Sequence, residues 1–188
     1  MADQAAGLLS PWLRNRRIRK ITPYLRGNIL DFGCGVGALA QLCAPDHYTG
    51  VDIDGPSINA ARIQNHQHRF YTSVPEDERF DSIVMLAVME HLKNPSDILC
   101  QMRALLTPDG RIIITTPHPL AERIHYLGAQ MRLFGAIANE EHEMLIDFNC
   151  MRGFAERADF GICKYERFLF GINQLFILKP HGYSASTL

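Results

Sequence analysis

Short apolar runs alternate with segments of helical periodicity over the first two thirds of the chain. The clearest run, Ile83–Met89, is apolar throughout, as expected for a strand that helices cover on both faces. Strands are predicted at 28–32, 48–53, 69–74, 80–87 and 111–116. Their alternation with helices predicts an α/β fold with a doubly wound, mostly parallel sheet.

Helices are predicted around these strands from capping residues and periodicity. Ser10 precedes Pro11, a pair typical of a helix N-cap and first helical position. This first helix is expected to end at Leu25, before Arg26-Gly27. Further helices are predicted at 38–43, 56–65 and 95–106.

The pattern changes after Pro119. Residues 120–138 are predicted to be helical and partly amphipathic, and 148–158 form another predicted helix. Strands at 162–170 and 172–178 surround a turn and predict an antiparallel hairpin that ends the chain. Together with the parallel strands, the hairpin gives a seven-stranded Rossmann-like sheet.

Composition and net charge indicate the class of protein and the partners that it can attract. The chain has 188 residues, 47% of them hydrophobic, and a formal net charge of −1, which predicts one globular domain. A near-neutral chain has no global electrostatic attraction to nucleic acid or to anionic membranes, although a local basic patch remains open. Five basic residues within 14–20 are interpreted as a solvated helix face.

The five cysteines indicate neither a disulfide framework nor a zinc site. They are odd in number, and none are spaced as C-x-x-C. No apolar run is long enough to span a bilayer, and the N-terminus lacks a signal-peptide pattern. We therefore expect a cytoplasmic protein with free thiols.

A glycine cluster, Gly33 to Gly37, separates the first predicted strand from a helix and allows close approach of a ligand to the backbone. Gly33, Gly35 and Ala38 also match the G-x-G-x-x-A dinucleotide fingerprint. Asp52, at the end of the second predicted strand, is placed to accept hydrogen bonds from a ribose. Asp31 would repel a pyrophosphate at close range but suits a cation, so S-adenosylmethionine is favoured over a nicotinamide cofactor.

Four segments resemble motifs of the class I S-adenosylmethionine-dependent methyltransferases. They read ILDFGCGVGALA (29–40), YTGVDID (48–54), FDSIVMLAVMEHLKNPSDIL (80–99) and LLTPDGRIIITTPHP (105–119). The last two are similar to the small-molecule, ubiquinone-biosynthesis-like branch (type 11/12). The hairpin near Lys179 is similar to the reversed seventh strand of that family.

The resemblance implies a set of cofactor contacts. These are Asp31, Gly33, Gly35 and Gly37 for the methionine moiety, Asp52 for the ribose, Ile53 and Thr72 for the adenine, and Leu86 beside the cofactor. Many relatives carry an acidic residue at the place of Thr72, so the adenine contact departs from the family pattern.

A hydroxyl acceptor also needs a proton acceptor. His91 follows the fourth predicted strand, His118 follows the fifth, and His142 lies in an acidic run. By family analogy, the segment around His142 covers the substrate. No ligand spacing in the chain predicts a metal site.

We therefore predict a single methyltransferase domain over 1–188. Its parts are an N-terminal helical cap (1–26), a cofactor-binding core (27–117), a substrate-covering insert (118–147) and a last helix with the hairpin (148–180). The predicted reaction transfers a methyl group from S-adenosylmethionine to a small molecule, most favourably at a hydroxyl oxygen, and leaves S-adenosylhomocysteine.

Two alternatives come from other functional classes. One is a nicotinamide-dependent oxidoreductase, and the other is a non-catalytic methyltransferase-like subunit that binds a partner protein or RNA. Nucleic acid is not expected as a partner, because the chain is near neutral. The sequence leaves the acceptor molecule and the oligomeric state open.

Overall fold

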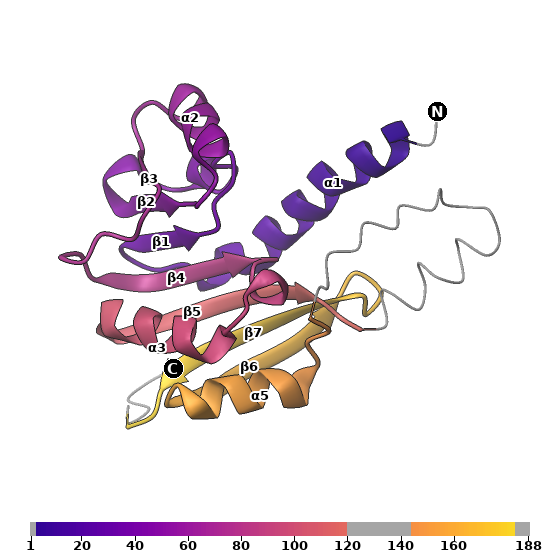
Figure 1. Ribbon diagram of the computed structural model, residues 1–188, viewed down its shortest axis with the longest axis vertical. Coiled ribbons are helices and arrows are strands. Elements are labelled where there is room, and N and C mark those ends of the chain that lie inside the picture. The colour runs from indigo at the N-terminus through magenta and orange to yellow at the C-terminus, as the bar shows by residue number, and fades with distance from the viewer. Residues whose placement is uncertain (1–2, 120–143, 183–188) are drawn as a thin grey trace.

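A seven-stranded sheet runs through the centre of the molecule (Figure 1). The computed structural model describes residues 3–119 and 144–182, with residues 3–10 as backbone alone. The strands are β1 (Ile29–Phe32), β2 (Tyr48–Val51), β3 (Arg69–Tyr71), β4 (Phe80–Leu86), β5 (Leu106–Pro117), β6 (Phe160–Phe168) and β7 (Asn173–Pro180).

The strand order is β3-β2-β1-β4-β5-β7-β6. All pairings from β3 to β5 are parallel, whereas β7 is antiparallel to both of its neighbours. The predicted fold class, a doubly wound sheet with a terminal antiparallel hairpin, is therefore confirmed.

Helices cover both faces of the sheet. They are α1 (Asp3–Ile21), α2 (Gly55–Gln64), α3 (Pro95–Leu105) and α5 (Phe148–Arg157), with short 3-10 helices at Thr22–Tyr24, Ala40–Leu42, Pro45–His47 and Met89–His91. Buried residues of α1 and α2 share one core with Tyr48 and Ile113. Those of α3 and α5 share the other with Ile112 and Phe176. None of these described helices is long and apolar enough to cross a membrane.

The predicted helix at 38–43 is wrong. Only Ala40–Leu42 forms a 3-10 turn there, and the loop before it closes through short-range bonds such as Gly37 N–H to the Cys34 carbonyl (3.0 Å). Six residues are too few to nucleate an α-helix in isolation. The glycine loop is consequently followed by tight turns and not by an α-helix.

The predicted ends of the first helix are also wrong. The helix begins at Asp3, before the predicted N-cap, and passes through Pro11. An internal proline removes one hydrogen bond of the helix, and the alanine- and leucine-rich stretch before it has high helix propensity. The α-helix ends at Ile21 and tightens into the 3-10 turn that contains Pro23. The other boundaries differ mainly in β5, which begins at Leu106, five residues before the strand predicted at 111–116.

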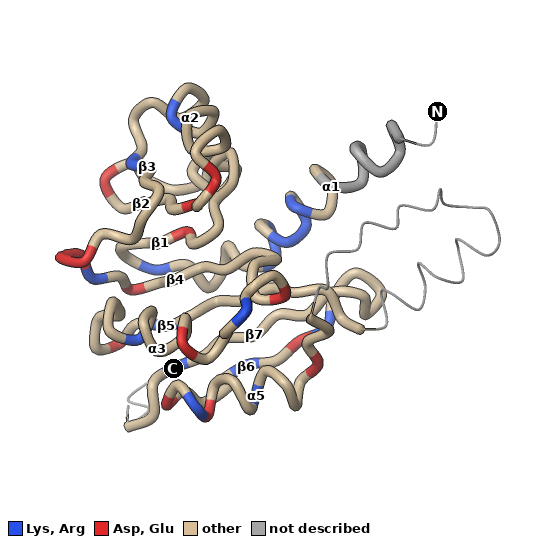
Figure 2. The backbone as a smooth tube through the Cα atoms, viewed as in Figure 1, with Lys and Arg blue, Asp and Glu red and all other residues tan. Residues whose placement is uncertain are grey.

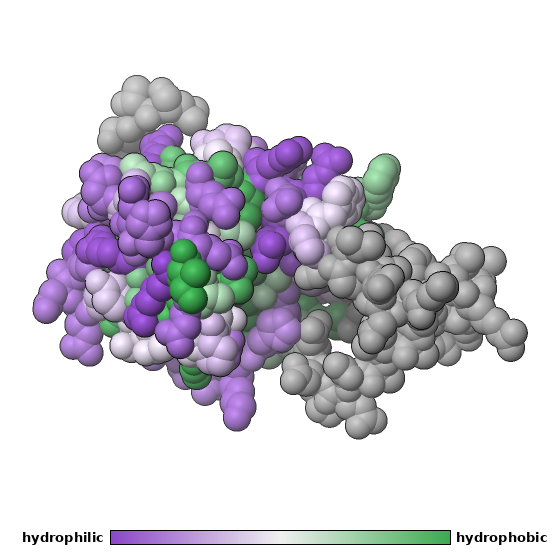
Figure 3. All heavy atoms as spheres, turned by 90° about the horizontal axis from the view of Figure 1, so that it is seen from above, coloured by the Kyte–Doolittle hydropathy of each residue, from purple (hydrophilic) through white to green (hydrophobic). Residues whose placement is uncertain are grey.

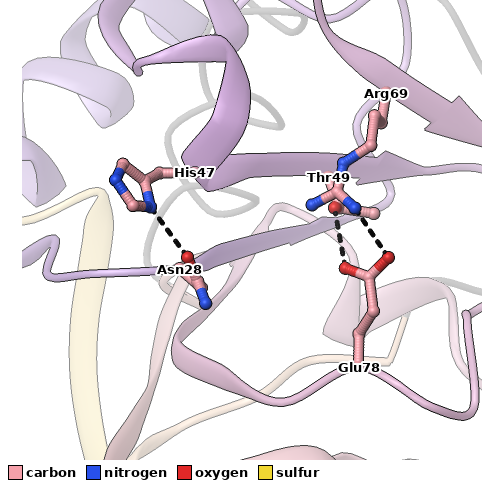
Figure 4. A network of polar contacts seen from close by, with 5 residues as sticks. All are labelled: Asn28, His47, Thr49, Arg69 and Glu78. Atoms are coloured by element: carbon pink, nitrogen blue, oxygen red, sulfur yellow. Dashed lines mark hydrogen bonds and ion pairs between the residues drawn. The ribbon is translucent and has the colours of Figure 1, made fainter.

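Polar contacts fasten the sheet at the edge where its parallel strands begin. Figure 4 shows Glu78, just before β4, between Thr49 of β2 and Arg69 of β3. Its carboxylate accepts hydrogen bonds from Arg69 Nη1 (2.8 Å) and Thr49 Oγ1 (3.4 Å).

The side of the molecule seen in Figure 3 is mostly hydrophilic, with apolar side chains in small separate groups.

The core of the hairpin gives a stability prediction. Phe176 is fully buried and contacts the rings of Phe148 and Tyr165, so Phe176→Ala leaves a cavity and should cost about 3–5 kcal/mol of unfolding free energy. Ile63→Ala on α2, where the side chain is 80% exposed, should change stability by less than about 0.5 kcal/mol. Urea unfolding of both variants measures the difference; equal losses would contradict the assignment of the core.

Candidate cofactor and active site

The site lies where the direction of the strand order reverses. β1 lies between β2 and β4, so the connections that leave β1 and β4 diverge to opposite sides and open a crevice at the carboxyl edge of the sheet. The glycine loop leaves β1 at this point. Gly33, Gly35 and Gly37 all have positive φ (78°, 52° and 75°), a region that glycine occupies readily. A Cβ on Gly33 would lie 2.4 Å from Val88 Cγ2.

Several amide groups of the loop already donate hydrogen bonds within the protein. Gly33 N–H and Cys34 N–H both donate to the Val51 carbonyl (2.8 and 3.0 Å). Gly35 N–H donates to Asp52 Oδ2 at 2.8 Å. With these donors used and no α-helix N-terminus behind them, the loop lacks the two features that bind a pyrophosphate.

Asp52 fixes the loop to the end of β2. While Oδ2 accepts from Gly35, Oδ1 accepts from the Asp54 amide at 2.9 Å. A carboxylate has about four lone-pair directions, so Asp52 keeps acceptor capacity on the side that lines the larger cavity.

Asp31 is a buried carboxylate, only 3% exposed. Its Oδ2 accepts a hydrogen bond from Tyr48 Oη at 2.7 Å. Burial raises the pKa of Asp31 to about 7, the Tyr48 bond lowers it, and the nearby Asp52 charge raises it. An ionised Asp31 would thus be unfavourable at neutral pH without a further cationic partner.

Two cavities meet at Gly33, which lines both. The larger, about 610 Å³, lies over the ends of β1 and β2 and is bordered by Phe32, Asp52, Val88 and Ile98 among others. The smaller, about 120 Å³, contains Asp31. The two predicted acidic residues therefore each border one of two adjoining spaces.

The structure brings most predicted cofactor residues to these cavities. Ile53, which is 94% exposed, and Thr72 line the larger one, and Gly35 and Leu86 line the smaller one. Gly37 lines neither, since it is buried against Phe70 and Asn65. Gly37 therefore supports the loop from behind.

The predicted histidines lie in different places. His91, exposed in the 3-10 helix after β4, lines the larger cavity. His118 follows β5 and borders neither of the two cavities, and burial lowers its pKa. His142 lies outside the described residues.

Two residues at the smaller cavity were not singled out from the sequence. Arg14 of α1 also lines it, and Tyr48 supplies the buried hydrogen bond to Asp31. Arg14 was recognisable only as one cation of a basic helix. Tyr48 was hidden because its partner depends on the register of β1 against β2, where Ile29 pairs with Tyr48.

Comparison with known proteins identifies the family. Residues 9–160 match a family model described as a methyltransferase domain. The chain belongs to this methyltransferase family. This match covers most of the chain, including the glycine loop and both acidic residues, and it replaces the nicotinamide alternative, which the occupied loop amides also disfavour.

Curated relatives of this methyltransferase include two bacterial proteins named ubiquinone biosynthesis O-methyltransferase. The protein from Aeromonas salmonicida is 28% identical over 116 residues, which are 54% of this chain and 49% of the relative. The protein from Glaesserella parasuis is 32% identical over 126 residues, which are 58% and 53% of the two chains. The chain thus spans about half the length of these curated relatives.

Solved structures show the same fold. An S-adenosylmethionine-dependent methyltransferase from Clostridium acetobutylicum matches with a TM-score of 0.70 and 13% identity, over 96% of this chain and 99% of the other. Magnesium protoporphyrin IX methyltransferase from Synechocystis, solved with bound SAH, matches with a TM-score of 0.60 and 18% identity, over 94% and 82%. With the family match, these structures show a methyltransferase domain with the fold of S-adenosylmethionine-dependent methyltransferases.

The buried Asp31 predicts a pH dependence of stability. Its pKa is raised from 3.8 to about 7 on folding, so between these values the unfolded chain has lost a proton that the folded chain keeps. Stability then falls as pH rises through this window. Asp31→Asn keeps an acceptor for Tyr48 and removes the titration, so its unfolding free energy should fall less than the parent's from about pH 5 to about pH 8.

Urea unfolding at both pH values measures this difference. Asp77→Asn, which replaces an exposed carboxylate, is the matched control and should keep the dependence of the parent. The same loss of stability in the parent and in Asp31→Asn would show that Asp31 is not the titrating group.

Proposed function

We propose that this domain transfers the methyl group of S-adenosylmethionine to a hydroxyl oxygen of a small, largely apolar molecule. The observation that carries the proposal is the pair of adjoining cavities with one acidic residue each, Asp31 in the smaller and Asp52 in the larger. The relatives' printed name, O-methyltransferase, supports oxygen as the acceptor atom.

The smaller cavity suits the methionine part of the cofactor. A cation beside the buried Asp31 would favour its ionised form, and the methionine part offers an ammonium and a sulfonium. Arg14, on the same cavity, suits its carboxylate. A Cβ at Gly35 would meet no atom within 4 Å, so the loop presents bare backbone to this space.

The larger cavity suits the nucleoside. Asp52 retains acceptor capacity for ribose hydroxyls, while Ile53, Val74 and Ile98 offer apolar surface to a purine ring. Thr72 and Ser73 lie on the same wall and provide hydroxyl and backbone groups for the polar edge of the base.

When bound, S-adenosylmethionine supplies an electrophilic methyl carbon with a neutral thioether as leaving group. This chain's residues then have to align the acceptor and take its proton. Of the histidines predicted as candidate bases and described by the structure, His91 lines the larger cavity, and an imidazole nitrogen can act as a proton acceptor. His91 would take the hydroxyl proton of the acceptor as the acceptor oxygen receives the methyl group.

Binding of S-adenosylhomocysteine tests the cofactor assignment. Asp52→Ala removes the ribose acceptor and should raise the dissociation constant at least tenfold, about 1.4 kcal/mol, by isothermal titration calorimetry. Asp54→Ala is the control, since Asp54 caps α2 through Ser57 N–H (3.0 Å) and lines neither cavity. Asp54→Ala should lower the melting temperature of the protein and leave the dissociation constant of S-adenosylhomocysteine unchanged. Similar affinities for the parent and Asp52→Ala would remove Asp52 from the site.

Turnover tests the base and the acceptor atom. Purified protein with S-adenosylmethionine and a panel of phenols, catechols and amines should form S-adenosylhomocysteine with the hydroxyl compounds. His91→Gln should lower turnover by about 10²–10⁴-fold without changing cofactor affinity, whereas exposed His66→Gln should not. A loss that appears only in His118→Gln or His142→Gln would transfer the role of the base. No turnover with any acceptor, together with a stoichiometric partner, would favour the non-catalytic alternative.

A further inference from the structure

The turn between β6 and β7 has a sequence that conflicts with its backbone. Its two central residues, Leu169 and Phe170, both have positive φ (52° and 55°), and Gly171 N–H donates to the Phe168 carbonyl at 3.1 Å. Turns with two central residues in this region are type I′, which favour Asn-Gly. Large side chains at these positions are unfavourable for folding, so the turn meets some other requirement.

Phe170 is held out in solvent by this turn. Its side chain is 100% exposed, while Phe168 packs against the core that α1 shares. Arg167 donates to the Gly171 carbonyl from Nε and Nη2 (3.2 and 3.0 Å). Arg167 thus holds the turn by hydrogen bonds, and no described residue covers the phenyl ring of Phe170.

Basic side chains of α1 lie beside the tip. Arg16, Arg19 and Lys20 border a surface hollow of about 310 Å³ together with Phe168 and Leu169. Lys20 is paired with Glu166. Among the described residues, neither Arg16 nor Arg19 forms an ion pair, and residues 4–26 contain no Asp or Glu. Figure 2 shows the resulting run of positive charge on α1.

A second aromatic residue lies on the same helix. Trp12 is 45% exposed, and the Arg16 guanidinium lies 5.2 Å from the centre of its ring. An exposed indole beside a guanidinium suits the boundary between lipid headgroups and acyl chains, where Trp and Arg are both favourable.

These features lie at the same edge of the sheet as the cofactor cavities. Asn173, the first residue of β7, pairs with Pro117 at the carboxyl end of β5, so the turn before it extends from that edge. Arg17 Nε donates to Asn173 Oδ1 at 2.8 Å and fastens α1 to the base of the tip. α1 also places Arg14 on the smaller cavity.

We propose that Trp12, Arg16, Arg19, Leu169 and Phe170 form a docking surface for an anionic lipid bilayer. Phe170 enters the headgroup region with Leu169, and the two guanidinium groups contact lipid phosphates. A bilayer is favoured over single-stranded RNA because RNA-binding proteins use aromatic rings as a platform for stacked bases, whereas Phe170 is fully exposed at a turn tip. Docking would turn the carboxyl edge of the sheet to the membrane. The further step, that the acceptor arrives from the lipid phase, rests on the proposed function, but the binding of lipid does not.

The turn itself provides a discriminating variant. Leu169→Asn/Phe170→Gly gives the turn its preferred residues, so the melting temperature should rise, while vesicle binding should fall at least about tenfold because the apolar tip is lost. Arg16→Gln/Arg19→Gln should weaken binding about fivefold for each charge removed. Co-sedimentation with vesicles of phosphatidylcholine and phosphatidylglycerol measures binding, and pure phosphatidylcholine vesicles should bind less.

Controls separate the outcomes. Ile63→Gln and Arg152→Gln replace an exposed apolar and an exposed basic residue on α2 and α5 and should bind vesicles like the parent. All these variants should keep the parent's affinity for S-adenosylhomocysteine, so failure here is distinct from failure of the proposed function. The proposal is overturned by no sedimentation with anionic vesicles, or by undiminished sedimentation of the turn variant. It is equally overturned if the surface binds only a single-stranded RNA oligonucleotide, or only a second copy of the chain.

Discussion

The bond between the glycine loop and the end of β2 is the constraint on which the site depends. The Val51 carbonyl takes two loop amides and Asp52 takes a third, so the loop is drawn toward β2 and its bare backbone borders both cavities. This arrangement needs a residue without a side chain at Gly33, where a Cβ would meet Val88. It also occupies three backbone donors of the loop, which would otherwise be available to a phosphate.

The burial of Asp31 lowers the stability of the folded chain but favours the binding of a cation. Burying a carboxylate with one hydroxyl partner is unfavourable, and an apolar residue of similar size would relieve that burden. The same unsatisfied charge becomes favourable once a cation enters the small cavity. Its tolerance in the core is therefore an argument that binding, and not folding, accounts for Asp31 at this position, as expected where active sites depart from optimal stability.

The sequence predicted those parts of the molecule that depend on local pattern. Continuous apolar runs such as Ile83–Met89 marked the central strands. The position of Asp31 and Asp52 near the ends of two predicted strands indicated an acidic crevice, because the carboxyl ends of parallel strands meet at one edge. The sequence alone could not predict contacts that depend on the register of two strands or on the rotation of a helix about its axis. Tyr48 meets Asp31 only through the β1–β2 register, and Arg14 is one of several cations until the rotation of α1 places it on a cavity. The helix predicted at 38–43 failed because glycine-rich turns took up residues that a short helix would need.

The reversed direction of β7 places the turn between β6 and β7 at the same edge of the sheet as the two cavities. In an all-parallel sheet, the residue before the last strand would lie at the amino edge, far from the cofactor loops. Because β7 is antiparallel to β5, the turn that precedes it extends from the carboxyl edge, next to the residues that follow β4 and β5. The topology therefore places the unfavourable Leu169-Phe170 turn at the carboxyl edge of the sheet. Helix α1 is bonded to β7 through Arg17, and it lines both the smaller cavity and the hollow beside the turn. One helix therefore borders the smaller cavity through Arg14 and the turn through Arg16 and Arg19.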